Sequence, residues 1–325
     1  MASASSPASQ ALPARLSAKV NPVFRKGILV ATNNRAVAKV VRRYGMRLGG
    51  ARFVAGEDFD LAVPVLRRLN EQGLLTNTTL LGEAVRDERE VAAVVAEYER
   101  VLDRIAAEGL KTNIALKLTH LGLDLGEEVA YANVERLVAH AATVGNFIRI
   151  DMEESARVDA TLRIYRRLRE AGHENVGTVL QSMLHRTPAD LEALLPLKPN
   201  LRLVKGAYLE APEVAHQKKA DVDAAYVRLA ERMLLNNSFT AIATHDEKII
   251  DHVIGFADQH GLTSEQYEFQ MLYGIRSQYQ LDLVRRGFRV LVATPYGAEW
   301  YFYLMRRLAE RPANVLFLLR GVVRR

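Results

Sequence analysis

The chain has 325 residues, of which 49% are hydrophobic and 25% are charged. These fractions are typical of a globular protein and exclude a disordered or fibrous chain. The absence of cysteine excludes disulfides, thiolate metal sites and a cysteine nucleophile. No run approaches the roughly 18 to 20 apolar residues that span a bilayer, and the N-terminus lacks the apolar core of a secretory signal. We expect a soluble cytoplasmic protein, or one that binds peripherally to the inner face of the cell membrane.

Positive charge is concentrated at the N-terminus, although the net charge is only +6. Residues 1–56 contain ten Lys or Arg residues and no acid, and the rest of the chain carries all 38 acids. Residues 1–20 are rich in Ala, Ser and Pro and are predicted to be a disordered leader. Apolar residues at helical spacing over 36–48, with basic residues between them, predict a basic amphipathic helix. This helix either docks on anionic lipid or packs on the folded domain with its cations solvated.

Eight short β-type runs then follow along the chain, and helical patterns separate them. The runs cover about 75–81, 113–118, 147–151, 176–181, 201–205, 239–244, 267–272 and 289–294. An apolar helix over 61–73 precedes the first run, and a helix over 298–311, ended by Pro312, follows the eighth. Repeated strand–helix units predict an α/β fold with a closed parallel (β/α)8 barrel. An open doubly wound sheet is the alternative, but no G-x-G-x-x-G motif follows the first run.

Polar side chains stand at or near the ends of seven of the eight predicted strands. They are Glu83, Lys117, Asp151, Gln181, Lys205, Thr244 with His245, and Gln270. The carboxyl ends of barrel strands meet around one mouth, where barrel enzymes keep their active sites. Arg202 and the adjacent pair Arg306 and Arg307 on the final helix add positive charge, so the site favours an anion. An arginine pair is suited to clamping a carboxylate while one arginine pairs with an acid such as Glu310.

The same residues bear on three other kinds of function. Metal binding is not expected, because no H-E-x-x-H motif occurs and T-H-D at Thr244–Asp246 lacks a further ligand at diagnostic spacing. Lys117, at a strand end, is placed as the amine of a Schiff-base lyase would be. Nucleic-acid binding is not expected, because the aromatic residues lie mainly in the C-terminal helix and not among the basic residues of the leader.

Six strings occur in order along the chain and together resemble one enzyme family. They are ALKLTHLGLD, FIRIDME, LRLVKGAYLE, ATHD, YEFQMLYG and EWYFYLMRRLAERPANV. The chain is similar to the proline dehydrogenases from about Phe53 to Gly321, and its length is similar to that of the monofunctional bacterial enzymes. The combination of K-G-A-Y with Y-x-x-R-R-x-x-E on a terminal helix makes the resemblance specific.

The resemblance implies a fold, a reaction and partners. The fold is a distorted (β/α)8 barrel with N-terminal helices and a C-terminal helix over the barrel mouth, and it carries non-covalent FAD. The reaction is oxidation of L-proline to Δ1-pyrroline-5-carboxylate, the first step of proline catabolism to glutamate, with electrons passed to a membrane quinone. A pyrroline-5-carboxylate dehydrogenase would act next. We accordingly expect three segments: the leader at 1–20, a helical segment at 21–73 and the catalytic barrel with its final helix at 74–325.

The resemblance also assigns residues by motif. Substrate contacts are Lys117, Asp151, Arg306 and Arg307, and the proline ring pocket is lined by Leu272, Tyr208 and Tyr303. Arg202 matches the arginine beside the reactive flavin nitrogen, and with Asp151 it is assigned to catalysis. Flavin contacts are Met152, Gln181, Lys205, Gly206, Ala207, Thr244, His245 and Gln270, with Glu310 added from the terminal helix, and Glu83 matches a gate that pairs with Arg306. One departure is Ala293 in VATPYG, where the family commonly has Tyr.

The composition agrees with this chemistry. Hydride transfer from the carbon next to a neutral amine needs alignment and an electron acceptor, but no metal and no cysteine. The proline carboxylate is a fixed negative group that arginines and Lys117 can hold. A cationic Arg202 would stabilise the anionic reduced flavin.

Overall fold

The computed structural model describes residues 50–82, 85, 87–236 and 239–310, together with single positions at 39, 41, 45 and 46. Within the last range the side chains at 306 and 308–310 are outside the description. The predicted leader, most of the predicted basic helix and Pro312 lie outside the described residues. The chain forms two compact units, Ala51–Trp300 and a second unit made of 1–50 and 301–325.

The unit Ala51–Trp300 is built on a closed barrel of eight parallel strands. These are β1 (Leu75–Leu80), β2 (Thr112–Leu116), β3 (Ile148–Ile150), β4 (Val176–Gln181), β5 (Leu201–Val204), β6 (Thr240–Ala243), β7 (Tyr267–Leu272) and β8 (Val290–Tyr296). Each strand pairs with the next in sequence, and β8 returns to β1 in a register that runs from Leu75 opposite Leu291 to Leu80 opposite Tyr296. The prediction of a closed barrel is therefore confirmed, and the open sheet is wrong.

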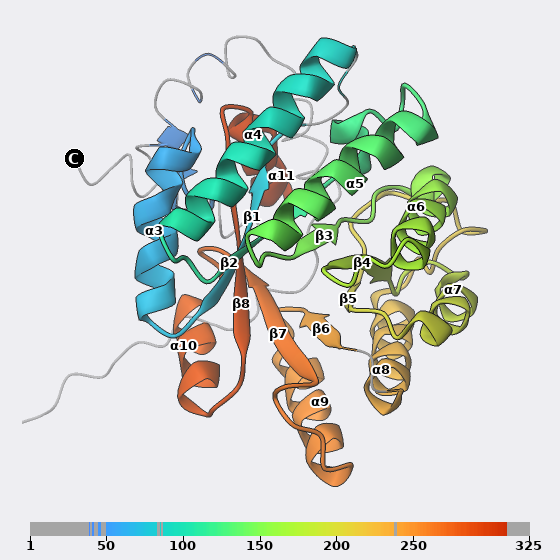
Figure 1. Ribbon diagram of the computed structural model, residues 1–325. Helices are drawn as coiled ribbons and strands as arrows, with labels where there is room; N and C mark the ends of the chain where they lie inside the picture. The colour runs from blue at the N-terminus through green and yellow to red at the C-terminus, as the bar shows by residue number, and fades with distance from the viewer. Residues whose placement is uncertain are drawn as a thin grey trace, which may run out of the picture. The chain divides into compact units, whose positions relative to one another are not determined.

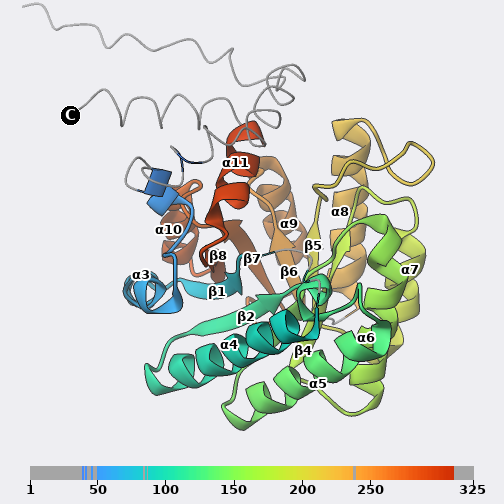
Figure 2. The same ribbon diagram turned by 90° about the horizontal axis from the view of Figure 1, so that it is seen from above.

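Helices surround the barrel strands, as Figures 1 and 2 show. They are α3 (Phe59–Glu71), α4 (Glu88–Ala107), α5 (Glu127–Thr143), α6 (Val158–Glu170), α7 (Thr187–Leu194), α8 (Lys219–Leu235), α9 (Glu247–Gln259) and α10 (Ser277–Arg285). Asp58, Asp87 and Asp246 begin α3, α4 and α9, because each side chain accepts backbone N–H groups of the first turn. A further helix, α11 (Trp300–Glu310), starts at the end of this unit and continues into the other.

The core lies between the strands and the helices. Alternate strand residues such as Ile114, Leu116, Ile148 and Ile150 are fully buried, and so are the apolar residues on the inward face of α4, among them Tyr98 and Leu102. Burial of this apolar surface is the main favourable term in folding. The predicted strand boundaries agree with the observed ones to within two residues, so Lys117, Asp151 and Lys205 come directly after β2, β3 and β5.

One glycine in β4 makes room for a buried arginine. Arg149 of β3 is 3% exposed, and its Nη1 donates to the carbonyl oxygens of Thr178 at 3.0 Å and Asn200 at 2.8 Å. A Cβ on Gly177 would lie 2.5 Å from this nitrogen and 2.5 Å from the Asn200 oxygen. Burial, followed by the nearby charge of Arg202, lowers the pKa of Arg149 to about 9. The guanidinium therefore stays charged at neutral pH and depends on its carbonyl partners.

We predict that Gly177→Ala destabilises the protein by about 1 to 3 kcal/mol, because the new methyl group must displace a guanidinium or a backbone carbonyl. Gly255→Ala is the matched control. Gly255 lies in α9 with no atom within 4 Å of an added Cβ, so its replacement should stabilise the helix by about 0.5 to 1 kcal/mol. Denaturant unfolding of both variants measures the difference. Equal effects at the two positions would show that β4 has room for a side chain.

Candidate active site

The strand ends bring most of the predicted residues of the barrel to one rim. Lys117, Asp151 and Lys205 directly follow their strands, and Thr244 and His245 directly follow β6. Gln181 ends β4, and Gln270 lies in β7 two residues before its end. All of these strands run parallel in one closed barrel, so their carboxyl ends face the same mouth.

The buried cation of this rim is Arg202, which is 8% exposed. Its Nη1 donates to Asp151 Oδ1 at 2.8 Å, and its Nε donates to Gln270 Oε1 at 2.6 Å. These bonds join β5 to the end of β3 and to β7, none of which are neighbours in the sheet. The third guanidinium nitrogen, Nη2, has no hydrogen-bond partner among the described residues. Arg202 is therefore held firmly from two sides, and its Nη2 can still donate a hydrogen bond to a bound group.

Gln181 is held by the segment that follows β3. Its Nε2 donates to the backbone oxygen of Glu153 at 2.8 Å. The Glu153 carboxylate accepts the backbone N–H of Thr119 at 3.1 Å and its hydroxyl at 2.7 Å. Burial raises the pKa of Glu153, against the opposing effects of the Thr119 bonds and the Lys117 charge. This network fixes Met152, which is 8% exposed, and places Lys117 close to the same segment.

The K-G-A-Y turn after β5 requires its glycine. Gly206 has a φ of +105°, and a Cβ there would lie 2.3 Å from Met183 Sδ. Farther along, the Glu210 carboxylate accepts both the backbone N–H and the hydroxyl of Ser155, each at 2.7 Å. The loop that carries the exposed Ala207 and the half-buried Tyr208 is thus tied to the loop after β3.

Lys205 belongs to an ion cluster beside this turn. Its Nζ lies 2.6 Å from Asp223 Oδ1 and 3.1 Å from Asp246 Oδ2, and Lys219 also contacts both acids. Partial burial alone would raise the pKa of Asp246, but its bond to Lys205 and the charges of both lysines outweigh this and lower it. The cluster ties the end of β5 to α8 and to the first turn of α9.

His245 and Leu272, predicted as separate contacts, are bonded to each other. The backbone N–H of Leu272 donates to His245 Nε2 at 3.0 Å. A nitrogen that accepts carries no proton, so the neutral imidazole has its hydrogen on Nδ1. Ala293, the departure from the family pattern, pairs with Leu272 across β7 and β8. A small side chain therefore stands at this place in the wall, beside a predicted lining residue of the ring pocket.

In the second unit, α11 carries Tyr303 and Arg307 one turn apart. The Arg307 guanidinium lies over the Tyr303 ring, 5.3 Å from its centre, which is a cation–π distance. The side chains of Arg306 and Glu310 and the whole of Glu83 lie outside the described residues. Their assigned roles, and the placement of the final helix over the mouth, stay predictions.

Two buried acids at the site were not predicted from the sequence, namely Glu153 and Glu268, which are 6% and 4% exposed. Glu268 accepts from Gln270 Nε2 at 2.7 Å. Strand alternation was the available signal for it, because residues two apart in Y-E-F-Q share a face of the strand. Glu153 follows its strand by three residues, and no simple pattern points to it.

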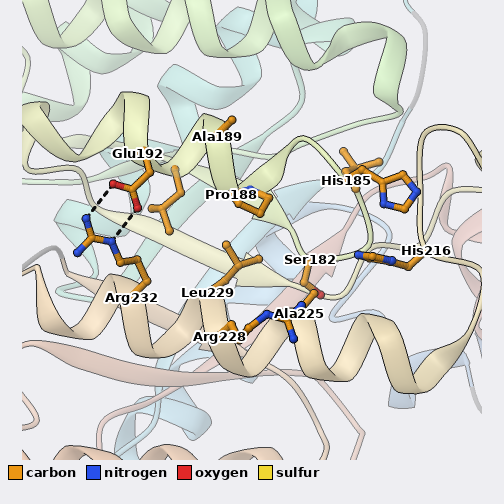
Figure 3. Close-up of a pocket in the computed structure, with 12 residues that line it drawn as sticks. Ser182, His185, Pro188, Ala189, Glu192, His216, Ala225, Arg228, Leu229 and Arg232 are labelled. Atoms are coloured by element: carbon orange, nitrogen blue, oxygen red, sulfur yellow. Dashed lines mark hydrogen bonds and ion pairs between the residues drawn. The ribbon is translucent and has the colours of Figure 1, made fainter.

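A separate hollow of about 520 Å³ lies between α7 and α8 (Figure 3). Glu192 and Arg232 form a double hydrogen bond at one end, at 2.7 and 2.8 Å, and His185 and His216 pack edge to face at the other. Its walls come from α7, from α8 and from the segments that precede these helices, among them Ser182, His185 and His216. Ser182 directly follows Gln181, a predicted site residue. This hollow is distinct from the rim described above.

The described part of the chain offers neither a metal site nor a membrane span. No group of three or more His, Cys, Asp or Glu side chains is placed there to hold a metal ion. None of the helices in these described ranges combines the length and the apolar character that crossing a membrane requires.

The Lys205 cluster predicts a specific pH dependence. The folded-state pKa of Asp246 lies below its ordinary value of 3.8, so its ion pair stabilises the fold above that pH and ceases to do so as the pH falls through the folded-state pKa. Lys205→Met removes much of this contribution at neutral pH. The difference in melting temperature from wild type should therefore be largest near pH 7 and shrink towards pH 3. Lys248→Met, at an exposed position in α9, is the control. A difference that is constant with pH would exclude the ion pair as its cause.

Comparison with known proteins gives a consistent result. Residues 62–320 match the family model for proline dehydrogenase. The chain is 40% identical over 303 residues to proline dehydrogenase 2 of Bacillus subtilis strain 168, covering 93% of this chain and 100% of that protein. It is 40% identical over 309 residues to the proline dehydrogenase of Deinococcus radiodurans, covering 94% and 99%.

A solved structure of proline utilization A (PutA) from Bdellovibrio bacteriovorus, inactivated by N-propargylglycine, has the same fold, with a TM-score of 0.78 at 24% identity. The likeness covers 89% of this chain but 36% of that longer one. The two full-length relatives and the family model settle the classification. The chain belongs to the proline dehydrogenase family.

Proposed function

We propose that this chain is an FAD-dependent enzyme that oxidises L-proline to Δ1-pyrroline-5-carboxylate and passes the electrons to a membrane quinone. Membership of the family supports a role in proline catabolism. The observation that carries the finer proposal is Arg202, held by Asp151 and Gln270 at the mouth with Nη2 left for another group. Because a quinone is lipid-soluble, the basic segment before Glu57 would bring the enzyme to an anionic membrane surface.

The residues at the rim fit a flavin. The backbone at Gly206 can take a close approach that a side chain would obstruct, and Lys205 supplies a cation for a pyrophosphate beside it. Arg202, Gln181 and Gln270 supply fixed polar groups for a ring system with acceptors along its edge. When bound, the flavin supplies the electron sink for a hydride.

The chain's own residues would bind and orient the substrate. Asp151 uses Oδ1 to hold Arg202, and Oδ2 has no partner among the described residues, so it can accept an N–H of the proline amine. Lys117 and the arginine pair of α11 would hold the carboxylate. Oxidation then removes a hydride from Cδ, the ring CH2 carbon next to nitrogen, and the N–H proton is lost to solvent, which leaves a neutral imine and an unchanged carboxylate. The positive charge of Arg202 stabilises the negative charge that develops beside it.

The experiment that tests this function is an anaerobic addition of L-proline to purified protein loaded with FAD. We expect a yellow protein whose flavin absorbance is lost with L-proline and kept with L-alanine, which lacks the ring. A Schiff-base lyase that uses Lys117 is the second candidate, and it would be colourless and trapped by borohydride in the presence of substrate. A nucleic-acid-binding protein would show neither response. Either of these results would remove the proposed oxidation.

We predict that Arg307→Met and Arg306→Met each raise the KM for L-proline about 10- to 100-fold with FAD retained, because a charge-assisted carboxylate contact contributes about 1.5 to 3 kcal/mol. Arg285→Met on α10 is the control, since this arginine is exposed and bonds to Asp282 in its own helix. Steady-state kinetics with a flavin count per protein provide the readout. Unchanged proline saturation in either variant would exclude that arginine from the carboxylate clamp.

A further inference from the structure

The position of Arg202 depends on which way the Gln270 carboxamide points. A carboxamide accepts at its oxygen and donates at its nitrogen, and the Arg202 Nε can only donate. The 2.6 Å bond therefore requires Gln270 Oε1 to face Arg202. A rotation of the amide by half a turn would bring two donors together and break one of the two bonds that hold the guanidinium.

Glu268 supplies the group that sets this direction. Its carboxylate is buried and, when charged, accepts hydrogen bonds without donating any. Gln270 Nε2 donates to Glu268 Oε1 at 2.7 Å. With the amide nitrogen committed to Glu268, the amide oxygen is left for Arg202. The two residues share a face of β7, because they are two positions apart on one strand.

The surroundings account for a carboxylate at this depth. A buried charge is costly unless other charges or hydrogen bonds compensate it. Besides the Gln270 bond, Glu268 Oε2 lies 3.8 Å from Arg289 Nη2, and the Glu268 charge also acts favourably on the buried Arg149. The charge of Glu268 thus acts on Arg149 from β7, as the charge of Asp151 does from the end of β3.

We propose that Glu268 is a positioning residue for the reaction, acting through Gln270 to hold Arg202 in its working orientation. This inference rests on the proposed function, since it assumes that Arg202 acts on the flavin. Glu268 contacts neither Asp151 nor Arg202 by any hydrogen bond of the described residues. Glu268 therefore affects the reaction through the Gln270 carboxamide.

The test uses a pair of residues that can be exchanged. Glu268→Gln removes the acceptor-only group, so the Gln270 amide is free to turn. The double variant Glu268→Gln/Gln270→Glu keeps the charge but moves it one position along the face, where either carboxylate oxygen accepts from Arg202 and no orienting group is needed. Gln270→Leu breaks the connection from the other side. Glu265→Gln makes the same substitution at an exposed position before β7 and is the control for Glu268→Gln.

Each protein is loaded with FAD and mixed with saturating L-proline under anaerobic conditions, and the rate constant of flavin reduction is measured per bound flavin. The dissociation constant of FAD and the melting temperature of the flavin-free protein are measured in parallel. We expect Glu268→Gln and Gln270→Leu to slow reduction about 10- to 100-fold. The exchanged pair should reduce flavin faster than Glu268→Gln, because its acceptor for Arg202 needs no orienting group, and Glu265→Gln should be unchanged. The FAD dissociation constant should rise and recover in the same order.

Wild-type reduction by Glu268→Gln, or an exchanged pair that folds and binds FAD yet stays as slow as the single variant, would overturn the proposal. A lowered melting temperature with an unchanged rate constant would mean that Glu268 is only structural. If Glu268→Gln does not fold, Gln270→Leu is measured instead. A wild-type rate constant of flavin reduction in Gln270→Leu would likewise overturn the proposal. If wild-type protein binds FAD but proline does not reduce it, the proposed function fails, while the order of FAD affinities still tests Glu268.

Discussion

The site depends on a single clamped cation, Arg202, whose guanidinium is bonded to a carboxylate on one side and to an amide on the other. Burying an arginine is favourable only when its charge and its donors are satisfied. Here two of the three nitrogens are satisfied by protein groups, and the third has no partner among the residues that the structure describes. The same interaction therefore stabilises the fold at the rim and, in the proposed function, leaves a directed positive charge where a negative one would develop.

The closed barrel makes this clamp available. Asp151 directly follows β3, and Arg202 and Gln270 lie in β5 and β7; these three strands are not neighbours in the sheet. In a barrel of eight strands, side chains from alternate strands form common layers in the interior, so these three residues meet although up to 68 positions separate a bonded pair. The surrounding ties, from Glu153 to Thr119 and from Glu210 to Ser155, fix the loops that carry the other candidate contacts.

Sequence reasoning was accurate where local patterns decide the outcome. Hydrophobic runs and their spacing located all eight strands, and the strand ends placed Asp151, Lys205 and Gln181 at the mouth. Sequence reasoning failed to predict side-chain contacts that depend on packing between distant segments. The pairing of Arg202 with Gln270 depends on how the strands are staggered around the barrel, which a single sequence does not encode in any short pattern. For the same reason Glu153 and Glu268 were missed, although alternation along β7 already placed Glu268 beside Gln270. The role of Glu83 as a gate comes from the resemblance, whereas the carboxylate clamp of Arg306 and Arg307 beside Glu310 was also inferred from their positions on the final helix.

The most direct test of the central claim is a crystal structure of the FAD-loaded protein with a five-membered-ring carboxylic acid that lacks the amine nitrogen. The account predicts that Arg202 keeps both its bonds, to Asp151 and to Gln270, and turns Nη2 towards the flavin. It also predicts that the carboxylate of the bound acid lies beside Lys117 and the arginines of α11. A flavin bound away from the carboxyl ends of β4 to β7, or an Arg202 released from both partners and turned away from the flavin, would contradict it.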